Sequence, residues 1–228
     1  MGTRKQHAVC HFMNWHIVVA RVLNIRYNIN IFKPPSMNET LIQPIESFNE
    51  ELDLLPSIHQ NGGGGNARNA SGLLYENLIK RTCNELSLVA KKNDYFRTKE
   101  INGKSLRTLQ VDWHVYKDDV LTYLIESKTY LDRCYLERAV TDFIKLNESP
   151  DVPDNAEYCI FAGQNATADD ALEYYKEYFK YETGKELTIF FLHPNRKRAS
   201  SRPIYKEMFH NDFKLDTTVY NEFINWLN

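Results

Sequence analysis

Apolar residues recur along the chain in two different rhythms, which predict the order of its helices and strands. Spacings of three and four residues are typical of amphipathic helices at residues 75–92, 131–146 and 171–182. Unbroken apolar runs at residues 158–162 and 187–192 are typical of buried strands. With a predicted hairpin, the order is helix, strand, strand, helix, strand, helix, strand. This order favours an α/β fold, with a mixed β-sheet flanked by helices.

The hairpin is predicted at residues 109–129, where two apolar and β-branched runs flank a polar break. If the chain turns at residues 118–120, Asp112 lies directly opposite Glu126. Lys128 then shares the face of Glu126, because side chains alternate along a strand. Two carboxylates and an amine would meet near one point. Carboxylates that close stay ionised most easily when a divalent cation lies between them.

This constellation resembles the catalytic motif of the PD-(D/E)XK nucleases, the fold of most type II restriction endonucleases. In that motif an acid opens the hairpin and Glu/Asp-x-Lys closes it; here Asp112 and Glu126-Ser127-Lys128 match. Val111 stands where the family often has proline. The resemblance implies a restriction-endonuclease-like core in which Asp112, Glu126 and the Ser127 carbonyl bind Mg²⁺. Lys128 would stabilise the negative charge that develops during hydrolysis.

Each of these residues also has a purely structural interpretation. Asp112 can be an acid at a hairpin end, and Glu126 and Lys128 can form a surface ion pair of little energetic value. The strand argues against a solvated pair, because both of its faces carry apolar residues, namely Tyr123, Leu124 and Ile125. We therefore favour the metal site. His114 shares the face of Asp112, and we expect a structural role for it.

The segment from Arg68 to Glu76, which opens the helix before the hairpin, is similar to a segment of restriction endonucleases. Its Tyr/Phe-Glu ending implies that Glu76 reaches the metal site or stands at its rim. The alternative is a solvated glutamate that the helix dipole stabilises. Arg68 would lie near the helix start, either meeting a phosphate or as a plain surface residue. Ser71 or Asn69 is expected to cap this helix.

The chain is expected to have three parts. Residues 1–36 form an N-terminal extension whose apolar stretch is interrupted by charges, so we expect a dispensable segment that does not span a membrane. Residues 37–65 form an N-terminal segment with a glycine-rich loop, and residues 66–228 form the nuclease domain. Met37 is the candidate first residue of the functional protein.

Within the N-terminal segment, a short helix is predicted around residues 46–55, ending before Pro56. The four consecutive glycines at residues 62–65 lose much backbone entropy on ordering, and they predict a mobile loop or hinge. This loop lacks the Lys-Ser/Thr ending of a phosphate-binding loop, which argues against nucleotide binding there.

The overall charge does not by itself indicate a nucleic-acid partner, because the 228-residue chain has a net charge of −2. A cleft can nevertheless be locally basic. Six cations between residues 91 and 107 suit either phosphate contacts or a solvated face. A second cluster follows the last strand, where DNA contact is favoured over a solvated loop: Arg196, Lys197, Arg198 and Arg202. The four scattered cysteines indicate reduced thiols in a cytoplasmic protein without a zinc site.

The resemblance as a whole implies a Mg²⁺-dependent hydrolase that cleaves double-stranded DNA at specific sequences, a type II restriction enzyme. Palindromic sites suit a twofold-symmetric protein, so we expect a homodimer, paired functionally with a DNA methyltransferase. Two alternatives stay open: a repair or recombination nuclease of the same fold, such as a junction resolvase, and a catalytically inactive DNA-binding protein. The stand-alone size favours restriction, and the intact motif argues against inactivity.

Overall fold

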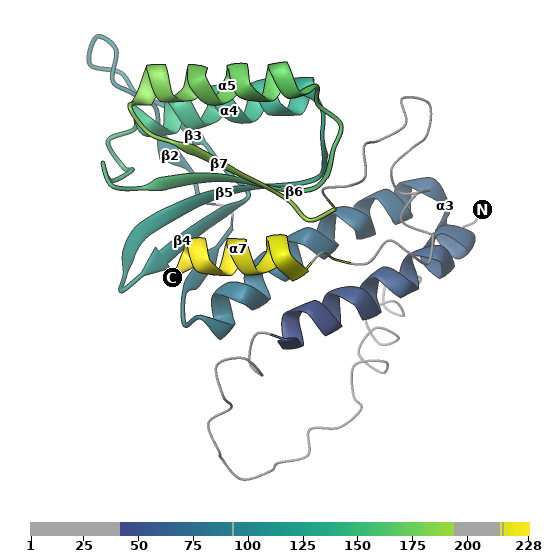
Figure 1. Ribbon diagram of the computed structural model, residues 1–228. Helices are drawn as coiled ribbons and strands as arrows, with labels where there is room; N and C mark the ends of the chain where they lie inside the picture. Colours follow the sequence, from purple (N-terminus) through teal and green to yellow (C-terminus); the bar gives the residue numbers. More distant parts are fainter. Residues whose placement is uncertain (1–41, 93, 194–214, 216) are drawn as a thin grey trace, which may run out of the picture. The chain divides into compact units, whose positions relative to one another are not determined.

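A five-stranded mixed sheet forms the centre of the structure, a computed structural model that describes residues 42–92, 94–193, 215 and 217–228 (Figure 1). Its strand order is β1-β4-β5-β6-β7, with antiparallel pairing from β1 to β5 and parallel pairing from β5 to β7. The predicted α/β fold with a mixed sheet flanked by helices is confirmed. The strands are β1 (Val89–Lys91), β4 (Trp113–Lys117), β5 (Val120–Leu131), β6 (Glu157–Asn165) and β7 (Leu187–Phe191).

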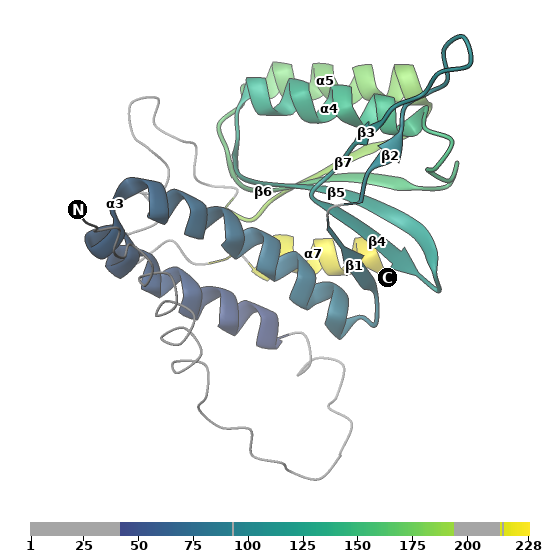
Figure 2. The same ribbon diagram turned by 180° about the vertical axis from the view of Figure 1, so that it is seen from behind.

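Helices cover both faces of this sheet (Figures 1 and 2). The helices α4 (Arg133–Asn147) and α5 (Asp169–Thr183) connect the parallel strands and pack on one face. The other face is covered by α3 (Ile42–Glu85) and α7 (Thr217–Leu227). Each layer buries its own apolar cluster against the sheet, which explains the unbroken apolar run in β6, a strand enclosed on both sides.

The β4–β5 hairpin has the predicted register, with Trp113 opposite Ile125. The turn is one residue shorter than predicted, because Asp118 and Asp119 alone form it, with φ angles of 51° and 63°. Aspartate tolerates this left-handed conformation, and a two-residue turn of this kind matches the twist of the strands. A bulge at Val115 and Tyr116 absorbs the difference and restores the register that places Asp112 opposite Glu126.

The prediction of a short helix ending before Pro56 was wrong, because α3 is helical over 44 residues and includes both Pro56 and the glycine run. The helix nevertheless folds back on itself (Figure 2). Arg81 forms an ion pair with Glu51, although thirty residues of straight helix would span about 45 Å. Contacting residues lie on either side of the glycine run, so the chain reverses near the predicted hinge.

Burial between the two arms of α3 explains why the helix continues where its sequence disfavours it. Phe48 packs edge-on against Tyr75, with 5.5 Å between the ring centroids, and both side chains are fully buried. Tertiary packing of an apolar face outweighs local propensity. Because the helix begins at Ile42, neither Asn69 nor Ser71 caps it, and Ser71 is buried.

The predicted extension of α3 to residue 92 was also wrong, since the helix ends at Glu85. Ser87 adopts a φ of 59°, and the Leu88 amide donates a hydrogen bond to the Cys83 carbonyl at 2.8 Å. This left-handed residue ends the helix. Val89 then begins β1, the edge strand beside β4.

The two crossover helices have the predicted apolar faces but differ in their caps. Asp132 caps α4 by accepting a hydrogen bond from the Tyr135 amide at 2.9 Å. The Thr-Ala-Asp-Asp sequence at residues 167–170 predicts that Thr167 caps α5, but its hydroxyl instead donates a hydrogen bond to the Leu131 carbonyl at 2.8 Å. Gly184 ends α5 with a φ of 71°, a left-handed conformation that favours glycine. The predicted cap of α5 was therefore wrong, because the Thr167 hydroxyl is bonded to a buried carbonyl of β5.

A small ribbon projects from the sheet and leads into β4. It pairs β2 (Phe96–Arg97) with β3 (Arg107–Leu109). The Asn102-Gly103 dipeptide between these strands, which favours a turn, is closed by a bridge between Ile101 and Lys104. None of the described helices is long and apolar enough to cross a membrane. The cysteines within the described residues are free thiols, as predicted: Cys83, Cys134 and Cys159.

Gly163→Ala is expected to destabilise the fold. A β-carbon at this position on β6 would lie 2.4 Å from the Tyr75 hydroxyl oxygen and 2.5 Å from the Thr129 carbonyl oxygen. Overpacking of this kind costs about 2–3 kcal/mol. The thermal midpoint should fall by about 4–12 °C, measured by calorimetry.

Gly72→Ala is the matched control, because nothing lies within 4 Å of the added β-carbon. Alanine is favoured over glycine in a helix by about 1 kcal/mol, so the midpoint should rise slightly. Equal midpoints for the two variants would contradict the close approach of α3 to β6.

Candidate active site

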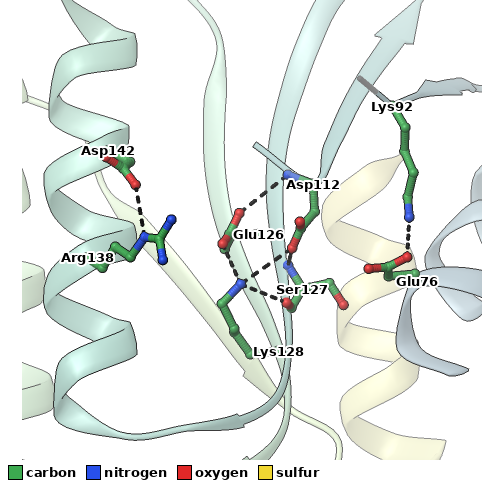
Figure 3. Close-up of polar contacts among 8 residues, drawn as sticks. All are labelled: Glu76, Lys92, Asp112, Glu126, Ser127, Lys128, Arg138 and Asp142. Carbon is green, nitrogen blue, oxygen red and sulfur yellow. Dashed lines mark hydrogen bonds and ion pairs between the residues drawn. The ribbon is translucent and has the colours of Figure 1, made fainter. Parts of the chain in front are cut away.

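Three charged side chains predicted to meet do lie together on the face of the sheet that α4 covers (Figure 3). Asp112 directly precedes β4, while Glu126 and Lys128 lie on β5 and point to the same side. The side chains are partly buried, with exposed fractions of 32% for Asp112 and 21% for both Glu126 and Lys128. Glu126 and Lys128 therefore do not form a freely solvated surface pair.

Two hydrogen bonds across the hairpin hold the carboxylates in place. The Ser127 amide donates to Oδ2 of Asp112 at 2.9 Å, and the Asp112 amide donates to Oε2 of Glu126 at 3.3 Å. Each carboxylate is thus bonded to the main chain of the opposite strand. Bonds to charged acceptors are stronger than neutral ones, so this exchange orients both acids.

The ammonium of Lys128 lies at the point where three oxygens converge. Its Nζ donates to Oε1 of Glu126 and to the Ser127 carbonyl at 3.1 Å, and it lies 3.5 Å from Oδ2 of Asp112. One cation therefore contacts a carboxylate from each strand and the intervening main-chain carbonyl. These oxygens belong to the residues expected to hold a metal.

The donor set fits Mg²⁺, which prefers hard oxygen ligands and retains several waters of its own. Within the described part of the chain, no three acidic, histidine or cysteine side chains gather into a metal-binding group. A cation here would accordingly be held by Asp112, Glu126 and the Ser127 carbonyl, together with water. The ammonium shows that these oxygens can share one positive charge.

Burial sets the protonation of the site. Desolvation raises the pKa of Glu126; the Lys128 charge opposes the rise, and the Asp112 charge adds to it. Desolvation lowers the pKa of Lys128, but the charges of Glu126 and Asp112 outweigh it, so the net pKa is above the ordinary value. Lys128 therefore carries its proton at neutral pH and adds a positive charge beside the two carboxylates.

Glu76 lies on α3, and Figure 3 shows its carboxylate paired with Lys92. Its carboxylate accepts a hydrogen bond from Lys92, whose ammonium also lies 4.7 Å from the centre of the Trp113 ring. The predicted role of Glu76 at the metal stays a prediction.

His114 has the expected structural role: it is fully buried, and its ring packs 4.6 Å from that of Phe96. Burial lowers the pKa of His114 to about 4.

Several predicted DNA contacts fall outside what the structure describes. The side chain of Arg68 is among them, as are Arg196, Lys197, Arg198 and Arg202. Two of the six cations between residues 91 and 107, both on the β2–β3 ribbon, form ion pairs with acids. Arg97 forms an ion pair with Asp151 at 2.5 Å, and Lys99 pairs with Glu148 at 2.8 Å. The interpretation of these two cations as a solvated face is the better one.

A cavity of about 360 Å³ opens beside the carboxylates. In the helix predicted at residues 131–146, helical spacing places Arg138 and Asp142 on the polar face, but spacing alone cannot show that this face overlooks the hairpin. The chain path places both residues in the cavity wall. Residues that line it include Thr108, Gln110, Asp112, Glu126, Arg138 and Asp142.

Comparisons with known proteins add little to this geometry. No family model matches the chain, and no curated protein matches it. Among solved structures, the chain is similar to P. aeruginosa ATCC27853 NucC in its cAAA-bound form. The two are 11% identical, with a TM-score of 0.43, over 85% of this chain and 100% of that chain. A likeness this distant carries no argument about function, which rests on the site itself.

Mg²⁺ is expected to raise the thermal midpoint of the protein. At a concentration ten times its dissociation constant, a ligand that binds only the folded state stabilises it by about 1.4 kcal/mol. For a chain of this size the midpoint should rise by about 3–6 °C. Glu126→Gln should lose this shift, because the amide replaces a charged ligand.

Glu148→Gln provides the matched control, since it also removes an acid paired with a lysine but lies in an exposed ion pair. It should retain the full shift. A shift that survives in Glu126→Gln would place the metal elsewhere.

Proposed function

We propose that this chain is a Mg²⁺-dependent endonuclease that hydrolyses phosphodiester bonds in double-stranded DNA. The single observation that carries the proposal is the convergence of Asp112, Glu126 and the Ser127 carbonyl on the Lys128 ammonium. A site with two held acids and an adjacent fixed cation has the groups that phosphodiester hydrolysis requires.

Hydrolysis requires a nucleophilic water and neutralisation of the phosphate charge; the attacking water loses its proton to solvent, and the leaving oxygen gains one from solvent. Asp112, Glu126 and the Ser127 carbonyl would hold Mg²⁺, which supplies a water of lowered pKa and withdraws charge from the phosphoryl oxygen. Lys128 donates hydrogen bonds and positive charge beside the attacked phosphorus, where negative charge develops. The hairpin supplies rigidity, because each carboxylate is bonded to the opposite strand.

We further propose the type II restriction class, acting at specific sequences as a homodimer. The Arg68–Glu76 segment and the cations after β7 support this class. Because β5, β6 and β7 are parallel, their carboxyl ends lie at the same end of the sheet. At that end β5 finishes three residues beyond Lys128, and the chain leaves β7. We propose that the cations following β7 in the sequence contact DNA: Arg196, Lys197, Arg198 and Arg202.

Incubation of the protein with supercoiled plasmid and Mg²⁺ tests the proposal. Discrete fragments with uniform ends are expected for a restriction enzyme. Cleavage confined to branched or damaged DNA would indicate a repair or recombination nuclease. Binding without cleavage, in a protein shown to be folded, would overturn the nuclease assignment and favour the inactive alternative.

Lys128→Ala is expected to reduce cleavage by at least about 100-fold, as does the loss of one group that stabilises transition-state charge. DNA affinity should change by less than about tenfold, because one cation accounts for one phosphate contact at most. Cleavage and affinity would be measured on the same duplex. Lys99→Ala, which removes an exposed paired lysine, should leave cleavage intact. Cleavage by Lys128→Ala at the wild-type rate would refute the role of this ammonium.

A further inference from the structure

The cavity beside the carboxylates is bounded by the β4–β5 hairpin and by α4, the helix that directly follows β5. Asp112 and Glu126 contribute from the hairpin, while Arg138 and Asp142 contribute from α4 across the gap (Figure 3). Three of these four charged groups are acids. Among the described residues that line the cavity, Arg138 is the single cation.

Arg138 is only loosely engaged within the protein. Its side chain is 79% exposed, and its Nε lies 3.8 Å from Oδ2 of Asp142, at the outer limit of an ion pair. An exposed pair of this spacing on one helix turn contributes little to stability. The guanidinium can therefore exchange Asp142 for an external anion.

Asp142 would keep a partner after such an exchange. Lys145 lies 3.4 Å from Oδ1, the other oxygen of the same carboxylate. The departure of Arg138 therefore leaves Asp142 paired with a second cation one turn along α4. Lys145 is not among the residues that line the cavity, which distinguishes the roles of the two cations.

We propose that Arg138 binds a backbone phosphate of the DNA strand that enters the cavity, next to the phosphate held at the carboxylates. The inference rests on the proposed function and names a further substrate contact for the same site. A guanidinium offers two parallel N–H donors that match the oxygens of a phosphate. It also supplies positive charge on the α4 side of the cavity, opposite the hairpin where Lys128 pairs with the two carboxylates, so the strand is held across the cavity by α4 on one side and the hairpin on the other.

The test compares Arg138→Gln with the wild-type protein in binding to a duplex that carries the mapped cleavage site, with Ca²⁺ in place of Mg²⁺. Loss of one phosphate contact should weaken binding about five- to tenfold at 0.1 M salt. The slope of log affinity against log salt should become shallower by about 0.9. In cleavage, KM should rise by a similar factor with kcat nearly unchanged, because the contact holds substrate and transition state alike.

Lys180→Gln is the matched control, since it removes one exposed cation from an ion pair on α5, outside the cavity. It should leave affinity and salt slope as in the wild-type protein. Equal effects of the two substitutions would overturn the assignment of Arg138 while leaving the nuclease proposal intact. Absence of cleavage by the wild-type protein refutes the nuclease proposal instead, so the two failures are distinguishable.

Discussion

One cation shared by three oxygens is the interaction on which the proposed chemistry depends. Asp112 and Glu126 repel one another in a partly buried place, and burial by itself raises the pKa of Glu126. Lys128 offsets this repulsion by contacting both acids and the carbonyl between them. Because Asp112 and Glu126 already surround a positive charge, their oxygens are arranged to bind a metal cation.

The register of the β4–β5 hairpin makes this interaction possible. A slip of one residue would turn Glu126 and Lys128 to the α3 side of the sheet. A bulge at Val115 and Tyr116 corrects the short two-residue turn and keeps the acids opposed. Buried clusters pack against the hairpin on both faces, so Glu126 and Lys128 lie on a strand enclosed by helices rather than on a loop. Such a placement limits the motion of the carboxylates.

The accuracy of the sequence predictions depended on how local the determining interactions were. The faces of α4 and α5 and the two parallel strands follow from spacing alone, because each pattern is completed within about fifteen residues. The long bent helix α3 could not be predicted from local preferences. Pro56 and four glycines oppose a helix, and the burial of apolar residues from both arms, such as Phe48 against Tyr75, outweighs them. Likewise, Thr167 was expected to cap α5, but its hydroxyl donates a hydrogen bond to a carbonyl more than thirty residues away in the chain.

For the candidate site, the order of residues was enough to predict that Asp112, Glu126 and Lys128 converge, since alternation along a strand and one turn determine their faces. Only the tertiary structure decided what surrounds them. It joined Glu76 to Lys92, neutralised Arg97 and Lys99, and brought Arg138 of α4 to the wall of the cavity. The physical reason is that pairing within a hairpin is a short-range property of the chain, whereas the partner of an exposed charge depends on which distant element packs beside it.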